Sequence, residues 1–190
     1  MKSSYHLPVL LEESINGLKV YPKGVYVDAT FGGGGYSKAI LDKATCMVWA
    51  IDRDPDAVAR AAKMSEPRFT ILRGNFGNME NLLTDHRVER LNGIVMDLGV
   101  SSPQIDDAAR GFSFRYDGPL DMRMNPETGE PASAWLAKAE VSEMTQVFRR
   151  YGELNRPDKL AHRIASARQE GPLNTTHDLI RILSLSLIHI

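Results

Sequence analysis

The sequence has little of what marks a secreted, membrane-spanning or strongly charged protein. Its single cysteine, Cys46, excludes an internal disulfide and fits a reducing compartment. No run approaches the roughly 18 apolar residues of a membrane-spanning helix, and the first residues lack the apolar core of a secretory signal. A net charge of −1 provides no general attraction to nucleic acid. We therefore expect a soluble cytoplasmic protein with no membrane partner.

The sequence also lacks a cluster of histidines and cysteines at metal-ligand spacing, so we expect no metal site. What it has is an ordinary globular composition, with 43% hydrophobic and 25% charged residues. This composition argues against disorder. A length of 190 residues suffices for one domain with a sizeable core, or for one domain plus an insertion.

Four consecutive glycines, Gly32 to Gly35, form the most distinctive stretch of the chain. Residues 25–27 before them are β-branched and aromatic, which predicts a buried strand, and residues 36–41 after them suit a helix. A strand, a glycine turn and a helix let the backbone approach a ligand closely, and the helix N-terminus offers free N–H groups. The layout predicts a small-ligand site, although a flexible loop also explains a run of glycines.

Three nucleotide-type ligands compete for this turn. A phosphate-binding P-loop needs a glycine directly before its lysine, whereas Lys38 follows Ser37, so that pattern fails. The Gly-x-Gly-x-x-Gly spacing of nicotinamide dehydrogenases fails as well, because its third glycine falls on Ser37 or Lys38. The remaining pattern, Asp28-x-x-x-Gly32-x-Gly34, resembles the first motif of class I S-adenosylmethionine (SAM) methyltransferases.

Three further strands are predicted, at residues 47–51, 69–72 and 93–100. Asp52 directly follows the first of them, 20 residues after Gly32, at a position where an acid usually binds ribose hydroxyls. Asp54, followed by Pro55, is typical of a helix cap, and both acids can also serve only as caps. We assign the cap to Asp54 and the ribose contact to Asp52.

Two more site candidates follow the later strands. Phe76 lies in the turn after residues 69–72, where a methyltransferase holds adenine, although a core phenylalanine is the ordinary explanation. Asp97 interrupts the apolar run 93–100, and an acid at the carboxyl end of a central strand lies where open α/β sheets bind ligands. The alternative for Asp97 is a structural bond to neighbouring backbone.

The chain changes character after residue 105. No convincing strand follows, and helices are predicted at residues 131–138, 141–151, 154 onward and 175 onward. The loop at 106–124 alternates the rings Phe112, Phe114 and Tyr116 with the basic residues Arg110, Arg115 and Arg123. Such interleaving can stack and charge-pair an extruded RNA base, or the rings can form a small core of their own. The later helices concentrate arginine and lysine, either as a solvated face or as phosphate contacts.

Five stretches of the sequence together resemble one family. They are His6–Leu11, Asp28–Ser37, Ala50–Pro55, Asp97–Gln104 and Arg110–Met124. The family they resemble is the bacterial 16S ribosomal RNA cytidine N4-methyltransferases, called RsmH or MraW. The resemblance covers the chain from about its N-terminus to residue 182, and the last two stretches are long and highly specific.

The resemblance implies a Rossmann-like class I SAM domain over residues 1–105 and an inserted substrate loop and helical domain over residues 106–184. It implies SAM as the cofactor and, as the substrate, the N4 of a cytidine in the 16S rRNA of the small ribosomal subunit. The SAM contacts carried over from the family fall on Gly34, Gly35, Tyr36, Asp52, Phe76, Asp97 and Gln104. Asp97 is also the catalytic candidate, and Arg110 and Arg123 are the substrate-binding candidates. The family commonly has His where Tyr36 stands, and only a backbone contact there would clearly survive the change.

The resemblance departs from the family in its extent. A full class I sheet has seven strands, whereas four are predicted here. Residues 185–190 resemble a foreign tail rather than family sequence. We therefore expect an incomplete chain that lacks methyltransferase activity by itself. The alternative function is a non-catalytic module that binds SAM or RNA.

Overall fold

The computed structural model describes residues 8–187, with side chains to residue 184. The chain divides into two compact units, Met1–Ser102 and Pro103–Ile190. This division falls three residues before the boundary expected at residue 105.

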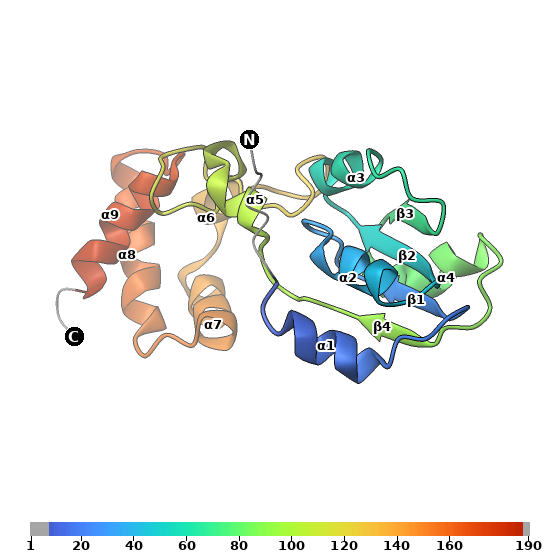
Figure 1. Cartoon of the computed structure of the whole chain (residues 1–190). Helices are drawn as coiled ribbons and strands as arrows, with labels where there is room; N and C mark the ends of the chain where they lie inside the picture. The colour runs from blue at the N-terminus through green and yellow to red at the C-terminus, as the bar shows by residue number, and fades with distance from the viewer. Residues whose placement is uncertain (1–7, 188–190) are drawn as a thin grey trace. The chain divides into compact units, whose positions relative to one another are not determined.

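Four parallel strands form the sheet of the first unit, in the order β3-β2-β1-β4 (Figure 1). The strands are β1 (Val25–Asp28), β2 (Met47–Asp52), β3 (Phe69–Arg73) and β4 (Gly93–Val95). This strand order, with helices in the crossovers, is that of the first four strands of a Rossmann-like sheet, so the predicted α/β class is confirmed. The carboxyl ends of all four strands meet at one edge, where open α/β sheets bind their ligands.

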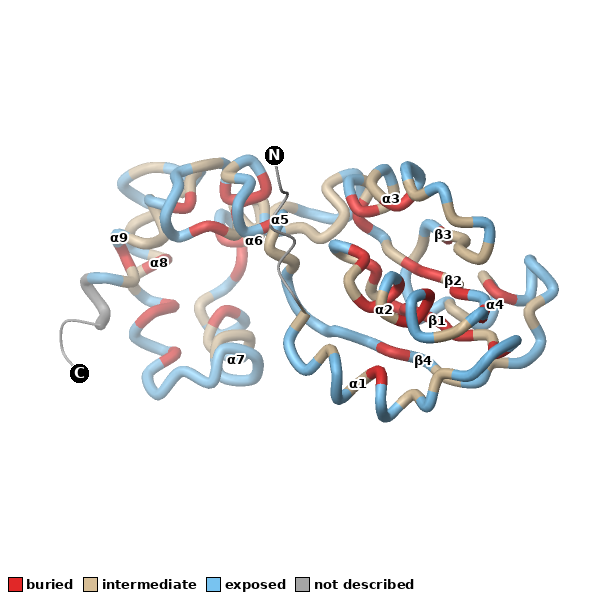
Figure 2. Tube along the Cα trace, viewed as in Figure 1, coloured by how far each residue is buried: buried red, intermediate tan, exposed pale blue. Residues whose placement is uncertain are grey.

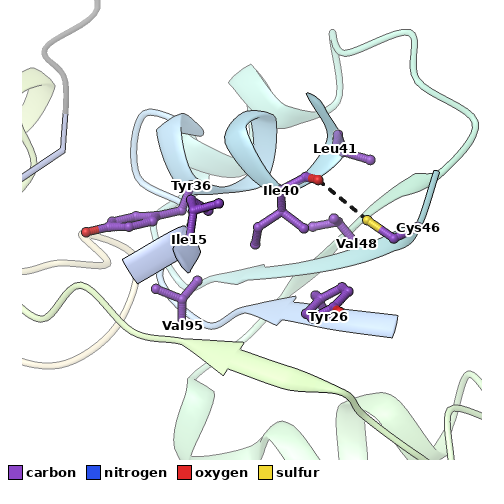
Figure 3. Packing of buried hydrophobic residues seen from close by; sticks show 8 residues of the cluster. All are labelled: Ile15, Tyr26, Tyr36, Ile40, Leu41, Cys46, Val48 and Val95. Atoms are coloured by element: carbon purple, nitrogen blue, oxygen red, sulfur yellow. Dashed lines mark hydrogen bonds between the residues drawn. The ribbon is translucent and has the colours of Figure 1, made fainter. Parts of the chain in front are cut away.

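Helices cover both faces of this sheet. They are α1 (Leu11–Leu18), α2 (Gly35–Lys43), α3 (Pro55–Ala61) and α4 (Met79–Thr84), the last preceded by a 3₁₀ turn at Phe76–Asn78. On one face, Ile15 of α1 and Ile40 of α2 pack with Tyr26, Val48 and Val95 from three strands (Figure 3). On the other face, the core joins strand residues to α4, namely Val27, Ile51, Leu72 and Leu83. A continuously apolar strand such as β2 is stable only with both faces covered.

The fourth strand is shorter than predicted. It was expected over residues 93–100, but β4 ends at Val95. The residues around its end, several of them apolar, are exposed (Figure 2). Exposed fractions are 42% for Ile94, 52% for Met96 and 68% for Leu98. The reason is pairing, because β4 pairs with β1, whose last residue, Asp28, lies opposite Val95. Within residues 8–187, no strand lies along the other edge of β4.

Helices make up most of the second unit. They are α6 (Ala132–Lys138), α7 (Val141–Gly152), α8 (Pro157–Glu170) and α9 (Thr176–Leu187), and they confirm the predicted helices. Met144 of α7 and Leu160 and Ile164 of α8 form the centre of their core. The short helix α5 (Ser102–Asp106) and a 3₁₀ turn at Ala108–Arg110 come before the long loop that leads to α6.

The structure describes only part of the expected foreign tail at residues 185–190. The backbone of α9 continues to Leu187, and residues 188–190 lie outside the described part of the chain. The foreign origin of this tail therefore stays a prediction. Across residues 8–187, every helix is too short or too polar to cross a membrane.

Candidate cofactor site

The acid of the glycine motif, Asp28, is buried at the end of β1. Its Oδ2 accepts hydrogen bonds from the Ser37 N–H (3.1 Å) and Oγ (2.7 Å), and its Oδ1 accepts from the Thr30 N–H (3.3 Å). Burial raises the pKa of the Asp28 carboxyl to about 6, against the opposing effect of these hydrogen bonds. Asp28 thus orders the turn and the first turn of α2 from inside the protein.

The glycines of the turn differ in what they are needed for. Gly34 has a φ of 81°, and a Cβ there would lie 2.8 Å from the Phe31 ring. A Cβ on Gly35 would lie 2.5 Å from the Pro8 ring. Gly33, by contrast, would meet nothing within 4 Å. Gly34 and Gly35 are therefore required by the packing of the protein itself, and Gly33 is where the backbone faces open space.

Hydrogen bonds from two other elements, β2 and α3, hold the peptide groups on either side of Gly32. At the end of β2, Asp52 Oδ2 accepts from the Gly32 N–H (2.8 Å), and its Oδ1 accepts from the Asp54 N–H (2.9 Å). From α3, Arg60 Nη2 donates to the Gly32 carbonyl (3.2 Å). We call these the Gly32 contacts. They fix the orientation of the half-exposed Asp52 carboxylate before any ligand binds.

Asp54 has the capping role predicted for it. Its Oδ1 accepts from the Asp56 N–H (3.0 Å) at the start of α3. The ribose contact assigned to Asp52 stays a prediction. Arg60 is a site residue that the sequence analysis missed, and its signal is weak: an arginine beside the buried alanine face, Ala57 and Ala61, of α3.

Asp97 lies two residues beyond the end of β4 rather than within a strand. Its side chain is exposed, and its backbone N–H donates to Thr30 Oγ1 (2.7 Å). Farther along the same segment, Ser101 approaches the glycine turn, since a Cβ on Gly32 would lie 3.7 Å from Ser101 Cβ. The segment after β4 therefore lies against the turn after β1, as the carboxyl ends of neighbouring parallel strands require.

Phe76 is 40% exposed in the 3₁₀ turn after β3. The ordinary explanation, a core phenylalanine, is therefore wrong for this residue. Asn75 Oδ1 accepts from the Gly77 N–H (2.9 Å) and fixes the turn that carries the ring. Contact between Phe76 and adenine stays a prediction.

Tyr36 directs its side chain into the protein. It is buried, and its hydroxyl donates to the Val9 carbonyl (2.7 Å) in the segment before α1. The ring packs in the core shared by α1 and α2 (Figure 3). A ligand contact at this position would therefore use the backbone, which is the kind of contact that tolerates Tyr in place of His.

The remaining predicted residues belong to the second unit. Gln104 is buried on α5. The Arg110 guanidinium is also buried, and its Nη2 donates to the carbonyls of Arg123 (3.2 Å) and Met124 (3.0 Å). Arg123 forms a bidentate pair with Asp121, in which the hydrogen-bonded guanidinium lowers the pKa of the carboxyl. Both arginines serve the structure of their own loop, and their contact with RNA stays a prediction.

Within residues 8–187, no three His, Cys, Asp or Glu side chains come together in a group that could hold a metal ion. The polar groups gathered at the carboxyl edge of the sheet are instead backbone N–H groups, single carboxylates and hydroxyls. Such a set suits an organic, partly charged ligand with hydroxyl groups.

Comparison with known proteins identifies the family. The sequence profile of the MraW methylase family matches residues 3–188. The chain belongs to the MraW methylase family. Among curated relatives, the ribosomal RNA small subunit methyltransferase H of Pseudoalteromonas atlantica is 48% identical over 186 residues, which are 96% of this chain and 60% of that protein. The protein of the same name from Burkholderia vietnamiensis is 46% identical over 184 residues, 94% of this chain and 59% of that protein.

The chain spans about 60% of the length of the curated relatives it matches. One solved structure, of a protein from an antibiotic biosynthesis pathway of Anabaena variabilis, is 24% identical in sequence to this chain. The match covers 35% of this chain and 26% of that protein, with a TM-score of 0.31. A likeness that low carries no argument about this chain.

Proposed function

We propose that the carboxyl edge of the sheet in the first unit binds SAM. The observation that carries this proposal is the set of Gly32 contacts, which present the Asp52 carboxylate beside a glycine turn that has open space at Gly33. A carboxylate fixed in this way suits the two vicinal hydroxyls of a ribose. The chemistry of the site fits SAM, which has no pyrophosphate and needs close backbone approach to its amino-acid part.

The remaining contacts follow from the family. Gly34, Gly35 and the backbone of Tyr36 would approach the amino-acid part, and the exposed Phe76 ring would cover adenine. Asp97 and Gln104 complete the set that the family resemblance implies. When bound, SAM supplies a methyl group on a sulfonium, which is ready for in-line transfer to a nucleophile.

We propose further that the methyl acceptor is the N4 of a cytidine in 16S rRNA of the small ribosomal subunit. The support is family membership and the name of the relatives, ribosomal RNA small subunit methyltransferase H. An exocyclic amine is a poor nucleophile because its lone pair is delocalised into the ring. Oxygen acceptors that hold its protons and fix its orientation would favour transfer.

Three oxygen-bearing side chains after β4 can serve as those acceptors. Asp97 is exposed beside the turn after β1, and Ser101 and Ser102 follow it in the same segment. The target base would leave its helical stack to reach them. Asp97 is the residue to which we assign the principal acceptor role.

The experiment is methyl transfer from labelled SAM to small-subunit particles, with the 190-residue chain and the full-length Pseudoalteromonas atlantica relative assayed side by side. Digestion of the RNA to nucleosides identifies the product, and N4-methylcytidine is the result we expect from the full-length protein. We expect no transfer by the 190-residue chain alone. A different methylated nucleoside would contradict the assigned acceptor, and transfer by the short chain would overturn its expected inactivity.

The second candidate is a non-catalytic module that binds SAM or RNA. The exposed apolar side chains at the end of β4 favour it for this chain, since the sheet as described offers an open edge there. SAM binding without methyl transfer, in a soluble and folded 190-residue chain, would support this candidate.

A further inference from the structure

We propose that Phe114 and Tyr116 form a stacking platform for unpaired RNA bases, an inference that rests on the proposed function as an RNA methyltransferase. Phe114 is 71% exposed and Tyr116 is 58% exposed, whereas Phe112 in the same loop is half-buried. A loop that used its aromatic rings as a core would bury all three. Two of the rings instead face solvent, where apolar surface is unfavourable unless a partner covers it.

The platform carries a cation beside its rings. The exposed Arg115 lies between Phe114 and Tyr116 in sequence, and its Cζ is 5.9 Å from the centre of the Phe114 ring. Aromatic rings and an arginine plane are the groups on which proteins stack unpaired bases. The two arginines expected to touch substrate, Arg110 and Arg123, are engaged inside the loop, so the exposed groups of this loop are the better candidates for RNA contact.

The loop is held in place before any ligand binds. Ser113 Oγ accepts from the N–H groups of both Arg115 and Tyr116, at 3.2 Å each. The Tyr116 carbonyl accepts from Thr176 Oγ1 (3.2 Å) at the start of α9. A loop whose backbone is fixed in this way loses little backbone entropy when a base stacks on the rings that it carries.

The next residue, Asp117, adds a second attachment to α9. Its Oδ1 accepts from the His177 N–H (3.1 Å), and this backbone hydrogen bond lowers the pKa of the Asp117 carboxyl. Asp117 therefore remains charged under ordinary conditions and keeps the loop attached. It also places a negative charge beside the platform, which opposes a phosphate contact there.

The charge of the second unit points to bases rather than phosphates as the ligand. Acidic and basic residues nearly balance over residues 103–190, so general attraction to the RNA backbone is weak. Stacking does not depend on net charge, because every base has a π-face. Paired bases in an A-form helix hide those faces, so the platform would select single-stranded or extruded bases.

The test is the binding of a single-stranded oligocytidylate RNA to the full 190-residue chain, followed by fluorescence anisotropy. We expect Phe114→Ala and Tyr116→Ala each to weaken binding by about 5- to 150-fold, the range measured for loss of one base–aromatic stack. Phe114→Leu should lose as much as Phe114→Ala, because it keeps the apolar surface but removes the ring. Tyr116→Phe should bind like the parent, and the parent should bind a duplex RNA more weakly than the single strand.

Tyr151 provides a matched control. It is 73% exposed in the same unit, with Arg150 Cζ 5.4 Å from its ring centre, but lies at the end of α7 outside the loop. Tyr151→Ala should leave RNA binding unchanged. Equal binding by the parent and the Phe114 and Tyr116 variants, an equal loss with Tyr151→Ala, or equal affinity for duplex RNA would each overturn the platform. SAM affinity, measured in parallel, should not change in any variant, so a failure of the SAM site would show separately.

Discussion

The glycine turn of the first unit and the loop at 110–124 of the second unit are both irregular segments held by charged side chains, but a buried acid, Asp28, holds the turn and a buried arginine, Arg110, holds the loop. In the turn, the carboxylates of Asp28 and Asp52 accept from backbone N–H groups. In the loop, the guanidinium of Arg110 donates to backbone carbonyls. A turn that leads into a helix N-terminus presents N–H groups, so acids suit it, whereas the loop turns its carbonyls inward and arginine suits it.

In both segments, ligand contacts should be sought at the groups that the charged residues hold in place. In each segment, several of the charged residues that stand out in the sequence bind the protein's own backbone. The surface left for a ligand is what those residues hold in place: the backbone at Gly33 and the Asp52 carboxylate in the first unit, and the Phe114 and Tyr116 rings in the second.

The largest effect is expected for Arg110→Ala. Removal of the buried guanidinium leaves two backbone carbonyls without their donor, so we expect the free energy of unfolding to fall by about 3 kcal/mol. Urea denaturation of the parent and the variant measures this loss. If stability is unchanged while RNA binding is lost, Arg110 contacts the substrate and does not hold the loop.

The next effect concerns the cofactor. Asp52→Ala should weaken SAM binding by about 1–3 kcal/mol, because charge-assisted hydrogen bonds to the ribose hydroxyls are lost. The exposed Asp56, four residues away, provides the control, and Asp56→Ala should bind SAM like the parent. Calorimetric titration of the three proteins decides the matter, and equal SAM affinity in folded Asp52→Ala would reject the ribose contact.

Asp28→Asn tests the buried acid through its pH dependence. The folded-state pKa of about 6 lies above the ordinary 3.8, so the folded protein binds more protons between these values. Stability from this group therefore rises as pH falls, by about 1.4 kcal/mol between pH 7 and pH 5. The variant lacks this contribution, so the stability difference between the two proteins should change by that amount. An identical pH dependence would show that Asp28 is not a buried, titrating acid.

Arg60→Ala should weaken SAM binding by about 1 kcal/mol, because the Gly32 carbonyl loses its donor and the turn is less fixed. Arg60→Lys keeps a donor of similar reach and should recover most of the affinity. The dissociation constant of SAM is the quantity to compare. Full affinity in Arg60→Ala would mean that the turn does not need the Arg60 donor.

The smallest effect is expected for Tyr36→Phe. Loss of the hydrogen bond to the Val9 carbonyl should reduce the free energy of unfolding by roughly 1 kcal/mol or less. SAM affinity should stay as it is, since a contact at this position uses the backbone. A clear loss of SAM affinity would show that the Tyr36 hydroxyl reaches the ligand.

Much of the first unit could be predicted from its sequence. Local patterns gave β1, β2 and β3 and the Asp54 cap, because a β-branched run and an Asp-Pro pair act over a few residues. The length of β4 could not be predicted in this way. An apolar run does not tell whether a neighbouring strand lies beside it, and residues 96–100 are exposed.

The contacts between distant residues were also beyond prediction. Arg60 reaches Gly32 across 28 residues, and Arg110 reaches the carbonyls of Arg123 and Met124 across a loop. Such contacts depend on how elements pack, which no local pattern records. The sequence therefore singled out these segments, but it did not show which of their residues hold the backbone in place.

Calorimetric titration of the 190-residue chain with SAM and, separately, with NAD shows whether the glycine turn binds SAM. We expect saturable binding of SAM at one site and no binding of NAD, because the turn lacks the third glycine that a pyrophosphate requires. Absence of SAM binding by folded protein, or NAD binding as tight as SAM binding, would contradict this expectation.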